Sequence, residues 1–445
     1  MSEFKTISRH AGTVLVGQLA VMAFGVTDTI VAGRYAESAL AALSVGTAIF
    51  LSVFVALMGV LQALLPVWAE LQGAQRFTEV GRSWRQALYL CAITVVIGMA
   101  ALLFPGALLR WAEVPMAIRG EVESYLAVLA MALMPALVFR MYSTLNQSLG
   151  KPLLVTWLQI GSLGVKVPLS VWFTFGGLGL EAQGAVGCAW ATLVVNYLML
   201  AVALYLLRTQ DLYKPYRIWQ RLERPDWARI REFARLGIPG GLAIMVEVTS
   251  FTLMALFIAR QGVIAAASHQ IASNFAAVLY MAPLAMGIAT SSRVSWWLGA
   301  GDARMARAAI RTGFKLVLLA SAVLAALTFA TRAGLASVYA ANPEVVALAG
   351  GLLAWVAVYH LADATQALCV FVLRCYRVTV APLVVYCVLL WGMGLAGGYV
   401  LSYRGLGSLA ARPEPATFWA TSAVALAATA AIFVALLWRA VRRRA

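Results

Sequence analysis

The chain is dominated by apolar runs of about twenty residues or more, separated by short polar connections. A helix that crosses the ~30 Å hydrocarbon core of a bilayer needs about 20 mainly apolar residues, and within lipid it satisfies its own backbone polar groups. The composition agrees, because 62% of the residues are hydrophobic and only 12% are charged. We therefore expect an all-α membrane protein with twelve transmembrane helices. The expected spans are residues 11–33, 44–66, 86–108, 122–145, 153–176, 185–207, 236–259, 267–291, 312–330, 345–370, 379–402 and 417–438.

The basic residues give the expected orientation. The formal net charge of +16 does not point to a nucleic-acid partner, because Lys and Arg fall in short clusters between apolar runs rather than on one basic face. Of the 34 Lys and Arg, 26 lie on the side shared by the two termini and 7 on the opposite side. By the positive-inside rule, both termini are expected in the cytoplasm.

The chain also repeats itself weakly. LQGAQRFTEVGRSWRQAL, from Leu71, aligns with WLGAGDARMARAAIRTGF, from Trp297, and the longest polar stretch lies between the two halves. We expect two pseudo-symmetric six-helix lobes, residues 1–207 and 236–445, joined by a cytoplasmic linker at 208–235. Two facing lobes suit alternating access along a path between them. The alternative is a duplication that only builds a stable bundle.

Three acidic residues lie well inside the expected spans: Asp28, Glu247 and Asp363. An acid near the centre of a membrane helix costs about 2.5–3.5 kcal/mol on insertion scales, so it marks a functional site by default. At 1.5 Å per residue, Glu247 and Asp363 fall at similar depths, whereas Asp28 lies nearer the outer side. The sequence therefore predicts an acidic pair in the second lobe and a separate acid in the first.

The neighbours of these acids sharpen the prediction. On the helix of Asp363, Tyr359 and Gln366 lie on the same face, in a polar and aromatic stripe expected to line a wet cavity. Lys166 is the one basic residue that we place inside a span, and it can reach the surface or pair with an acid. The structural alternative for Asp28 is a bond to a neighbouring threonine hydroxyl that pins helices together.

Around these acids the sequence resembles the multidrug and toxic compound extrusion (MATE) transporters, within their bacterial NorM-like branch. The resemblance covers about residues 12–440. It rests on GQLAVMAFGVTDTIVAGRYAESALAALSVG and GVLQALLPVWAELQGAQR in the first half, and on GIPGGLAIMVEVTSF, LGAGDARMARAAIR and LADATQALCVFVLRCYRVTVAP in the second.

The resemblance implies an efflux antiporter, not an enzyme, that exports amphipathic and often cationic drugs or dyes in exchange for H⁺ or Na⁺. It implies a location in a bacterial inner membrane. It places Asp28, Glu247 and Asp363 at the family's acidic positions, where we expect all three to couple transport to the ion. Tyr359 falls at its tyrosine, and we expect Tyr359 and Lys166 to support the cation or substrate site. Lys166 stands where many members have Asn, and a fixed ammonium disfavours bound sodium. We therefore expect proton coupling, with Na⁺ at Glu247 and Asp363 as the alternative, no cofactor, and a monomer.

Two other functions are open at this stage. A flippase for lipid-linked saccharides, from the same exporter superfamily, handles anionic diphosphates and would line its cleft with several basic residues. A membrane-embedded transferase would need a His/Asp or carboxylate cluster at the interface and loops that hold a donor. Well inside the expected spans we find three acids against one lysine, and the outer loops are short, so both functions fit less well.

Overall fold

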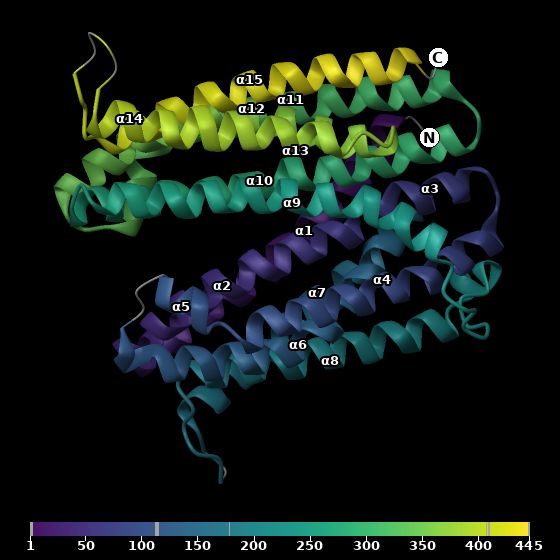
Figure 1. The fold of residues 1–445 in the computed structure, drawn as a ribbon, viewed down its shortest axis with the longest axis horizontal. Helices are drawn as coiled ribbons and strands as arrows, with labels where there is room; N and C mark the ends of the chain where they lie inside the picture. The colour runs from purple at the N-terminus through teal and green to yellow at the C-terminus, as the bar shows by residue number, and fades with distance from the viewer. Residues whose placement is uncertain (1–2, 112–114, 178, 406, 408–409, 444–445) are drawn as a thin grey trace. The chain divides into compact units, whose positions relative to one another are not determined.

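The structure is a computed structural model that describes residues 3–111, 115–177, 179–405, 407 and 410–443. Over these residues the chain is almost entirely helical (Figure 1). The helices are α1 (Glu3–Tyr35), α2 (Glu37–Gln62), α3 (Leu65–Gly73), α4 (Phe77–Leu103), α5 (Gly106–Trp111), α6 (Met116–Ser148), α7 (Leu153–Phe175), α8 (Ala185–Thr209), the 3₁₀ helix η1 (Asp211–Tyr216), α9 (Trp227–Ala259), α10 (Val263–Gly299), α11 (Ala303–Tyr339), α12 (Pro343–Cys375), α13 (Val380–Tyr386), the π-helix η2 (Cys387–Ala396), α14 (Gly397–Tyr403) and α15 (Pro415–Arg443).

Within the described part of the chain, twelve helical segments are long and apolar enough to cross a membrane. Each expected span falls on one of them, so the predicted fold class is confirmed. Several helices are longer than the apolar runs: α9 begins at Trp227, whereas residue 236 was expected. The difference arises because a helix continues past its apolar window into the charged residues that flank it.

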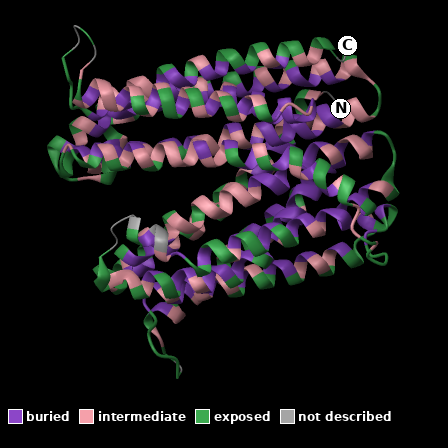
Figure 2. Cartoon of the chain, in the orientation of Figure 1, coloured by how far each residue is buried: buried purple, intermediate pink, exposed green. Residues whose placement is uncertain are grey.

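Large apolar side chains remain exposed along the spans (Figure 2), as in Val96 at 66%, Leu319 at 63% and Val424 at 62%. A soluble protein rarely exposes apolar residues over such long continuous surfaces. Bilayer lipid is the solvent that these faces suit, because the hydrocarbon core is as apolar as the side chains themselves.

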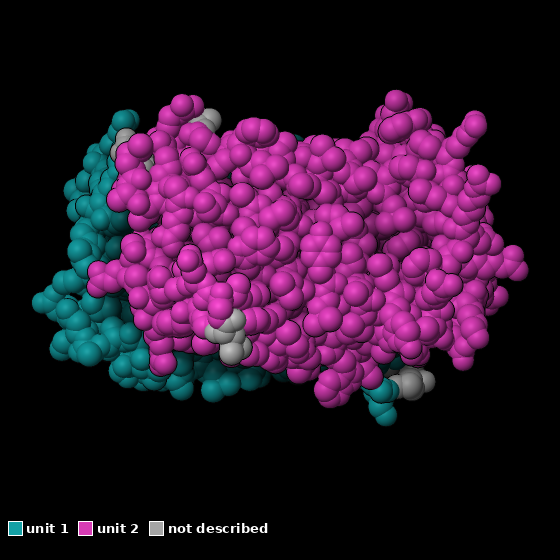
Figure 3. Space-filling model, turned by 90° about the horizontal axis from the view of Figure 1, so that it is seen from below, with its two compact units in different colours: residues 1–15, 242–445 teal, residues 16–241 magenta. Residues whose placement is uncertain are grey.

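The chain forms two compact units, each with its own hydrophobic core (Figure 3). The unit that begins the fold, here called the first unit, comprises residues 16–241 (magenta in Figure 3, unit 2 in its key). The second unit comprises residues 1–15 with 242–445 (teal, unit 1 in the key). These bounds differ from the expected lobes at two places. The first fifteen residues join the second unit, where Ile7 is buried in the core and Glu3 bonds the guanidinium of Arg293 at 2.7 Å. The expected linker joins the first unit, where Tyr213 is part of the core.

The internal repeat is visible in the helix ends. Gln75 and Gly301, at equivalent positions of the repeat, both have positive φ (57° and 77°), and each follows the C-terminus of a helix. The next N–H of each turn reaches back to a carbonyl of the last helical turn, Arg76 to Leu71 at 2.9 Å and Asp302 to Trp297 at 3.0 Å. This is the bond of a Schellman cap, so both halves end these helices in the same way.

The connection between the halves is held against the first unit. Arg85 donates to both carboxylate oxygens of Glu223 at 2.6 and 3.2 Å, and to the carbonyl of Arg217 at 2.8 Å. Gln86 donates to the carbonyl of Arg224 and accepts from the N–H of Asp226, and Tyr89 donates to the Glu223 carbonyl at 2.8 Å. The segment expected as a linker is therefore a built part of this unit rather than a loose tether.

Gly81 tests this packing. A Cβ at Gly81 would lie 1.9 Å from the carbonyl oxygen of Tyr216, so the substitution Gly81→Ala must push the connection off α4. We expect a loss of about 1–3 kcal/mol, typical of an overpacked contact, measured as a lower melting temperature in detergent. Gly120→Ala is the matched control, because Gly120 is also the fifth residue of its helix but has nothing within 4 Å. That control should be neutral or slightly stabilising, and equal losses in both variants would contradict the contact.

A second prediction concerns pH. The hydrogen bonds from Arg85 hold the pKa of Glu223 below the ordinary glutamate value. A depressed pKa adds stability above the ordinary value, and this stability is lost as the pH falls through the lowered one. Because the Glu223 side chain is 36% exposed, Glu223→Gln should cost only about 0.5–1 kcal/mol at neutral pH. The stability difference from wild type should begin to shrink near the ordinary glutamate pKa of about 4.3. It should vanish once the pH lies below the lowered pKa of Glu223. In the same melting series, a loss of equal size at every pH would contradict this contribution.

Candidate functional site

In the second unit the two acids lie on different helices and share one hydrogen-bond donor. Glu247 is on α9, and Asp363 is on α12, where Gln366 follows one turn later. The Gln366 amide Nε2 donates to Glu247 Oε1 at 3.0 Å and to Asp363 Oδ1 at 3.0 Å. The expected acidic pair is therefore present: a single amide group links both carboxylates. Asp363 and Gln366 are buried, whereas Glu247 is partly exposed.

A third helix supports this amide. The Tyr386 hydroxyl donates to Gln366 Oε1, so both ends of the glutamine side chain are engaged. Tyr386 ends α13, and the π-helix η2 begins at the next residue. From η2, Trp391 Nε1 donates to the carbonyl of Val246, immediately before Glu247, at 3.2 Å. Irregular helical segments of this type often occur at functional sites, and here one holds the backbone of the acidic position.

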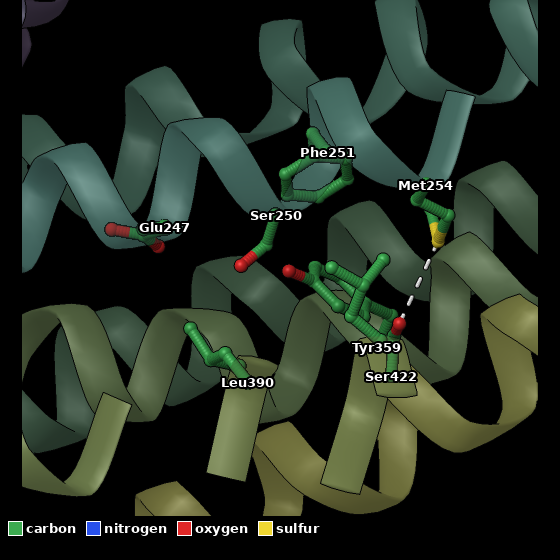
Figure 4. Close-up of a pocket in the computed structure, with 8 residues that line it drawn as sticks. Glu247, Ser250, Phe251, Met254, Tyr359, Leu390 and Ser422 are labelled. Carbon is green, nitrogen blue, oxygen red and sulfur yellow. Dashed lines mark hydrogen bonds between the residues drawn. The ribbon is translucent and has the colours of Figure 1, made fainter. Parts of the chain in front are cut away.

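A small cavity opens beside Glu247 (Figure 4). It is formed by α9, α12, η2 and α15, and it has about 20 Å³ of room for water, enough for at least one molecule. Ser250 and Tyr359 contribute hydroxyl groups to its lining (Figure 4). Its lining residues are Glu247, Ser250, Phe251, Met254, Tyr359, Leu390, Leu395 and Ser422. The stripe predicted around Asp363 thus contributes Tyr359 to a mainly apolar cavity that holds a few polar groups.

Aromatic side chains form one wall of the cavity and extend behind it. Phe251, Tyr359 and Trp419 pack edge to face in all three pairs, with ring centroids 5.8–6.1 Å apart. The Trp419 Nε1 donates to His269 Nδ1 at 3.2 Å, so this buried histidine orients the tryptophan. The cluster fixes the position of Tyr359 through packing on two sides.

The first unit holds the third acid in a different arrangement. Asp28 on α1 forms an ion pair with Lys166 on α7, with 2.8 Å between Oδ1 and Nζ. The Ser170 hydroxyl donates to the same Asp28 oxygen at 2.9 Å. Both charged residues are buried, and Lys166 is fully inaccessible. The partner of Lys166, which sequence alone left open, is therefore Asp28.

The threonines beside Asp28 play no part in this arrangement. Thr27 and Thr29 donate to the carbonyls of Ala23 and Gly25 on their own helix. The structural alternative of an Asp28–threonine bond is thus wrong, but Asp28 does link two helices through Lys166 and Ser170. The five predicted site residues consequently form two groups in two compact units: Glu247, Asp363 and Tyr359 in one, Asp28 and Lys166 in the other.

Known proteins place this arrangement in a family. The MatE family model matches residues 14–172 and 239–400, which include all three acids and Lys166. The chain belongs to the MatE family. It is 36% identical to a probable multidrug resistance protein NorM of Aromatoleum aromaticum, over 98% of this chain and 94% of that one. It is 32% identical to the multidrug resistance protein MdtK of Pectobacterium atrosepticum, over 98% and 95%.

Solved structures share the MatE fold at low sequence identity. A crystal structure of the eukaryotic MATE transporter AtDTX14 has a TM-score of 0.88 at 19% identity, and covers 99% of this chain and 98% of its own. A mutant of the Vibrio cholerae MATE transporter VcmN has a TM-score of 0.89 at 18% identity, with the same coverage. Together with the twelve segments, the family identifies a multi-pass inner-membrane protein.

One sequence inference about this MatE protein needs correction. Lys166 is not the one basic residue inside a span, because Arg140 lies within α6 and Arg374 within α12, both buried. Arg140 donates to Gln62 Oε1 at 2.6 Å. Arg140 falls inside the expected span 122–145 but was counted with the connection that follows it, and Arg374 is helical because α12 continues past the expected end at residue 370.

Several site residues gave no sequence signal of their role. Tyr386 and Trp391 are two among many aromatic residues, and Ser170 is an ordinary hydroxyl residue in an apolar helix. Only Gln366, on the stripe with Asp363, could have been singled out. Among the described residues no group of three His, Cys, Asp or Glu could hold a metal ion, so a cation here would bind the acidic pair and neutral oxygens.

The shared amide gives a direct prediction. Gln366→Leu removes the donor to both carboxylates and leaves the Tyr386 hydroxyl without its acceptor, so we expect a loss of about 2–3 kcal/mol at neutral pH. Tyr386→Phe removes one neutral bond and should cost about 1 kcal/mol. Melting temperatures of the two purified variants in detergent compare these losses. An equal effect of both substitutions would argue against the amide as the centre of the group.

Proposed function

We propose that this protein is a secondary multidrug antiporter that exports amphipathic, often cationic compounds in exchange for protons. The names of its relatives and its family support a transporter rather than an enzyme. The observation that carries the proposal is the Gln366 amide between Glu247 and Asp363, because it brings two acids of different helices to one site.

Two neighbouring carboxylates repel when both are ionised, and burial disfavours charge further. A bound proton or a cationic ligand relieves the repulsion, so the two compete for the same pair. Protonation from the outside would favour release of a cationic drug, and loss of the proton to the cytoplasm would restore attraction for the next one. An exchange of one proton for one monovalent cation moves no net charge and is driven by the pH gradient. If one more positive charge enters than leaves, the membrane potential adds about 2.3 kcal/mol per 100 mV.

The geometry favours a proton over sodium as the coupling ion. Sodium needs several oxygen ligands, but the group that faces both carboxylates is an amide nitrogen with two N–H donors. An N–H donor repels a metal cation. Glu247 is partly exposed, and the adjoining cavity has room for a water molecule that can exchange a proton with this acid.

The remaining features of the proposal come from the sequence. We propose alternating access between two lobes, cytoplasmic termini, and a monomer as the working unit, with drugs or dyes as cargo. A flippase for anionic lipid diphosphates is disfavoured, because the cavity is lined by an acid and by no basic residue. Lys166 is also occupied, since it pairs with Asp28.

Efflux in reconstituted vesicles tests the proposal. A cationic dye loaded into vesicles that carry the wild-type protein should leave when a pH gradient is imposed, acidic on the side of release. A sodium gradient of equal size at uniform pH should drive little efflux. Dye movement under the sodium gradient alone would identify sodium, and not the proton, as the coupling ion. Scrambling of a labelled lipid without dye efflux would indicate a flippase.

The acidic pair should be essential for exchange. Glu247→Gln and Asp363→Asn keep size and hydrogen bonding but cannot ionise, so each should insert normally and lose proton-driven efflux by at least tenfold. Glu344→Gln, an exposed acid on the same helix as Asp363, is the matched control and should transport as wild type. Normal efflux by both site variants would place the coupling elsewhere.

A further inference from the structure

The ammonium of Lys166 is held by three oxygen atoms. Its Nζ lies 2.8 Å from Asp28 Oδ1, 2.9 Å from the carbonyl oxygen of Cys188 and 2.7 Å from Thr192 Oγ1. An ammonium group has three N–H donors, so each donor has one acceptor. The residues come from three helices, α1, α7 and α8, and the ammonium is fully buried among them.

The acceptors are the kinds of oxygen that bind small cations: a carboxylate, a backbone carbonyl and a hydroxyl. Ser170 adds a hydrogen bond that fixes the carboxylate from α7, and the Thr192 hydroxyl also donates to the Cys188 carbonyl at 3.0 Å. Asp28 and Lys166 together carry no net charge. The acid of the first unit therefore already has its cation, and that cation is covalently attached to the chain.

We propose that Lys166 is a tethered cation filling a monovalent-cation site formed by Asp28, the Cys188 carbonyl and Thr192, so that Asp28 exchanges no ion during transport. The inference deepens the proposed antiport function and rests on it in one respect: the exchanged ions are those of Glu247 and Asp363 alone. It also predicts what the site accepts once the lysine is shortened, namely a small ammonium ion with N–H donors. A quaternary ammonium lacks these donors and does not fit.

Chemical rescue tests the site itself. Lys166→Ala removes the ammonium and leaves Asp28 facing the space where it was. Methylammonium chloride should then raise the melting temperature of the purified variant in detergent by several degrees, whereas tetramethylammonium chloride at the same ionic strength should not. The rise should be absent in Asp28→Asn/Lys166→Ala, and in Lys151→Ala, which shortens an exposed lysine. Equal responses to the two salts would overturn the proposal.

A second measurement works with the intact pair. Two proteins are compared, both carrying Glu247→Gln/Asp363→Asn so that the acidic pair cannot bind ions. One keeps Asp28 and Lys166, and the other carries Asp28→Asn/Lys166→Met. For each, bound radioactive sodium and proton uptake across the neutral pH range are measured. Equal numbers of bound sodium ions and protons are expected in the two proteins, because Asp28 and Lys166 hold no exchangeable ion. One additional ion per protein in the form that keeps the pair would overturn the inference. Neither measurement requires transport, so failure of antiport would show separately in wild-type vesicles.

Discussion

A carboxylate inside a membrane-spanning helix has to be met by hydrogen-bond donors or a counter-charge, because the surrounding hydrocarbon offers neither. This protein meets that constraint in two ways. Asp28 receives a lysine ammonium and a serine hydroxyl, and its charge is cancelled within the protein. Glu247 and Asp363 receive one neutral amide between them. The first arrangement is closed, whereas in the second the buried guanidinium of Arg374 attracts Glu247 but the two acids share a single neutral donor.

The packing around the acids follows from this difference. In the second unit, a tyrosine holds the far end of the glutamine, a π-helix supports the backbone before Glu247, and an aromatic cluster fixes Tyr359 at the cavity wall. These contacts orient the acids while leaving Glu247 partly exposed to the cavity. In the first unit, the charged groups are sealed, and the hydrogen-bond capacity of the ammonium is used completely. A site that exchanges ions needs access of the kind that Glu247 has. A fixed contact between helices is suited to a buried ion pair such as that of Asp28 and Lys166.

The sequence was sufficient for the twelve helices and for the neighbouring positions of Glu247 and Asp363, because hydropathy and helical rise are local properties. It also placed Gln366 and Tyr359 on the face of Asp363. It could not find Tyr386, Trp391 or Thr192, since their roles depend on which helices pack side by side. Nor could it pair Lys166 with Asp28, 138 positions away, because that distance is closed only by tertiary packing. The unit boundaries also differ from the expected lobes, because Ile7 and Tyr213 each join a core distant in sequence.

Infrared difference spectroscopy of the purified protein, with and without a cationic dye, tests the central claim most directly. If the acidic pair gives up a proton when it accepts a cation, adding the dye should remove absorbance of a protonated carboxyl group and add that of a carboxylate. The change should be present in wild type and absent in the Glu247→Gln/Asp363→Asn double variant. A protein that binds the dye with no change in its carboxyl absorbance would contradict the account.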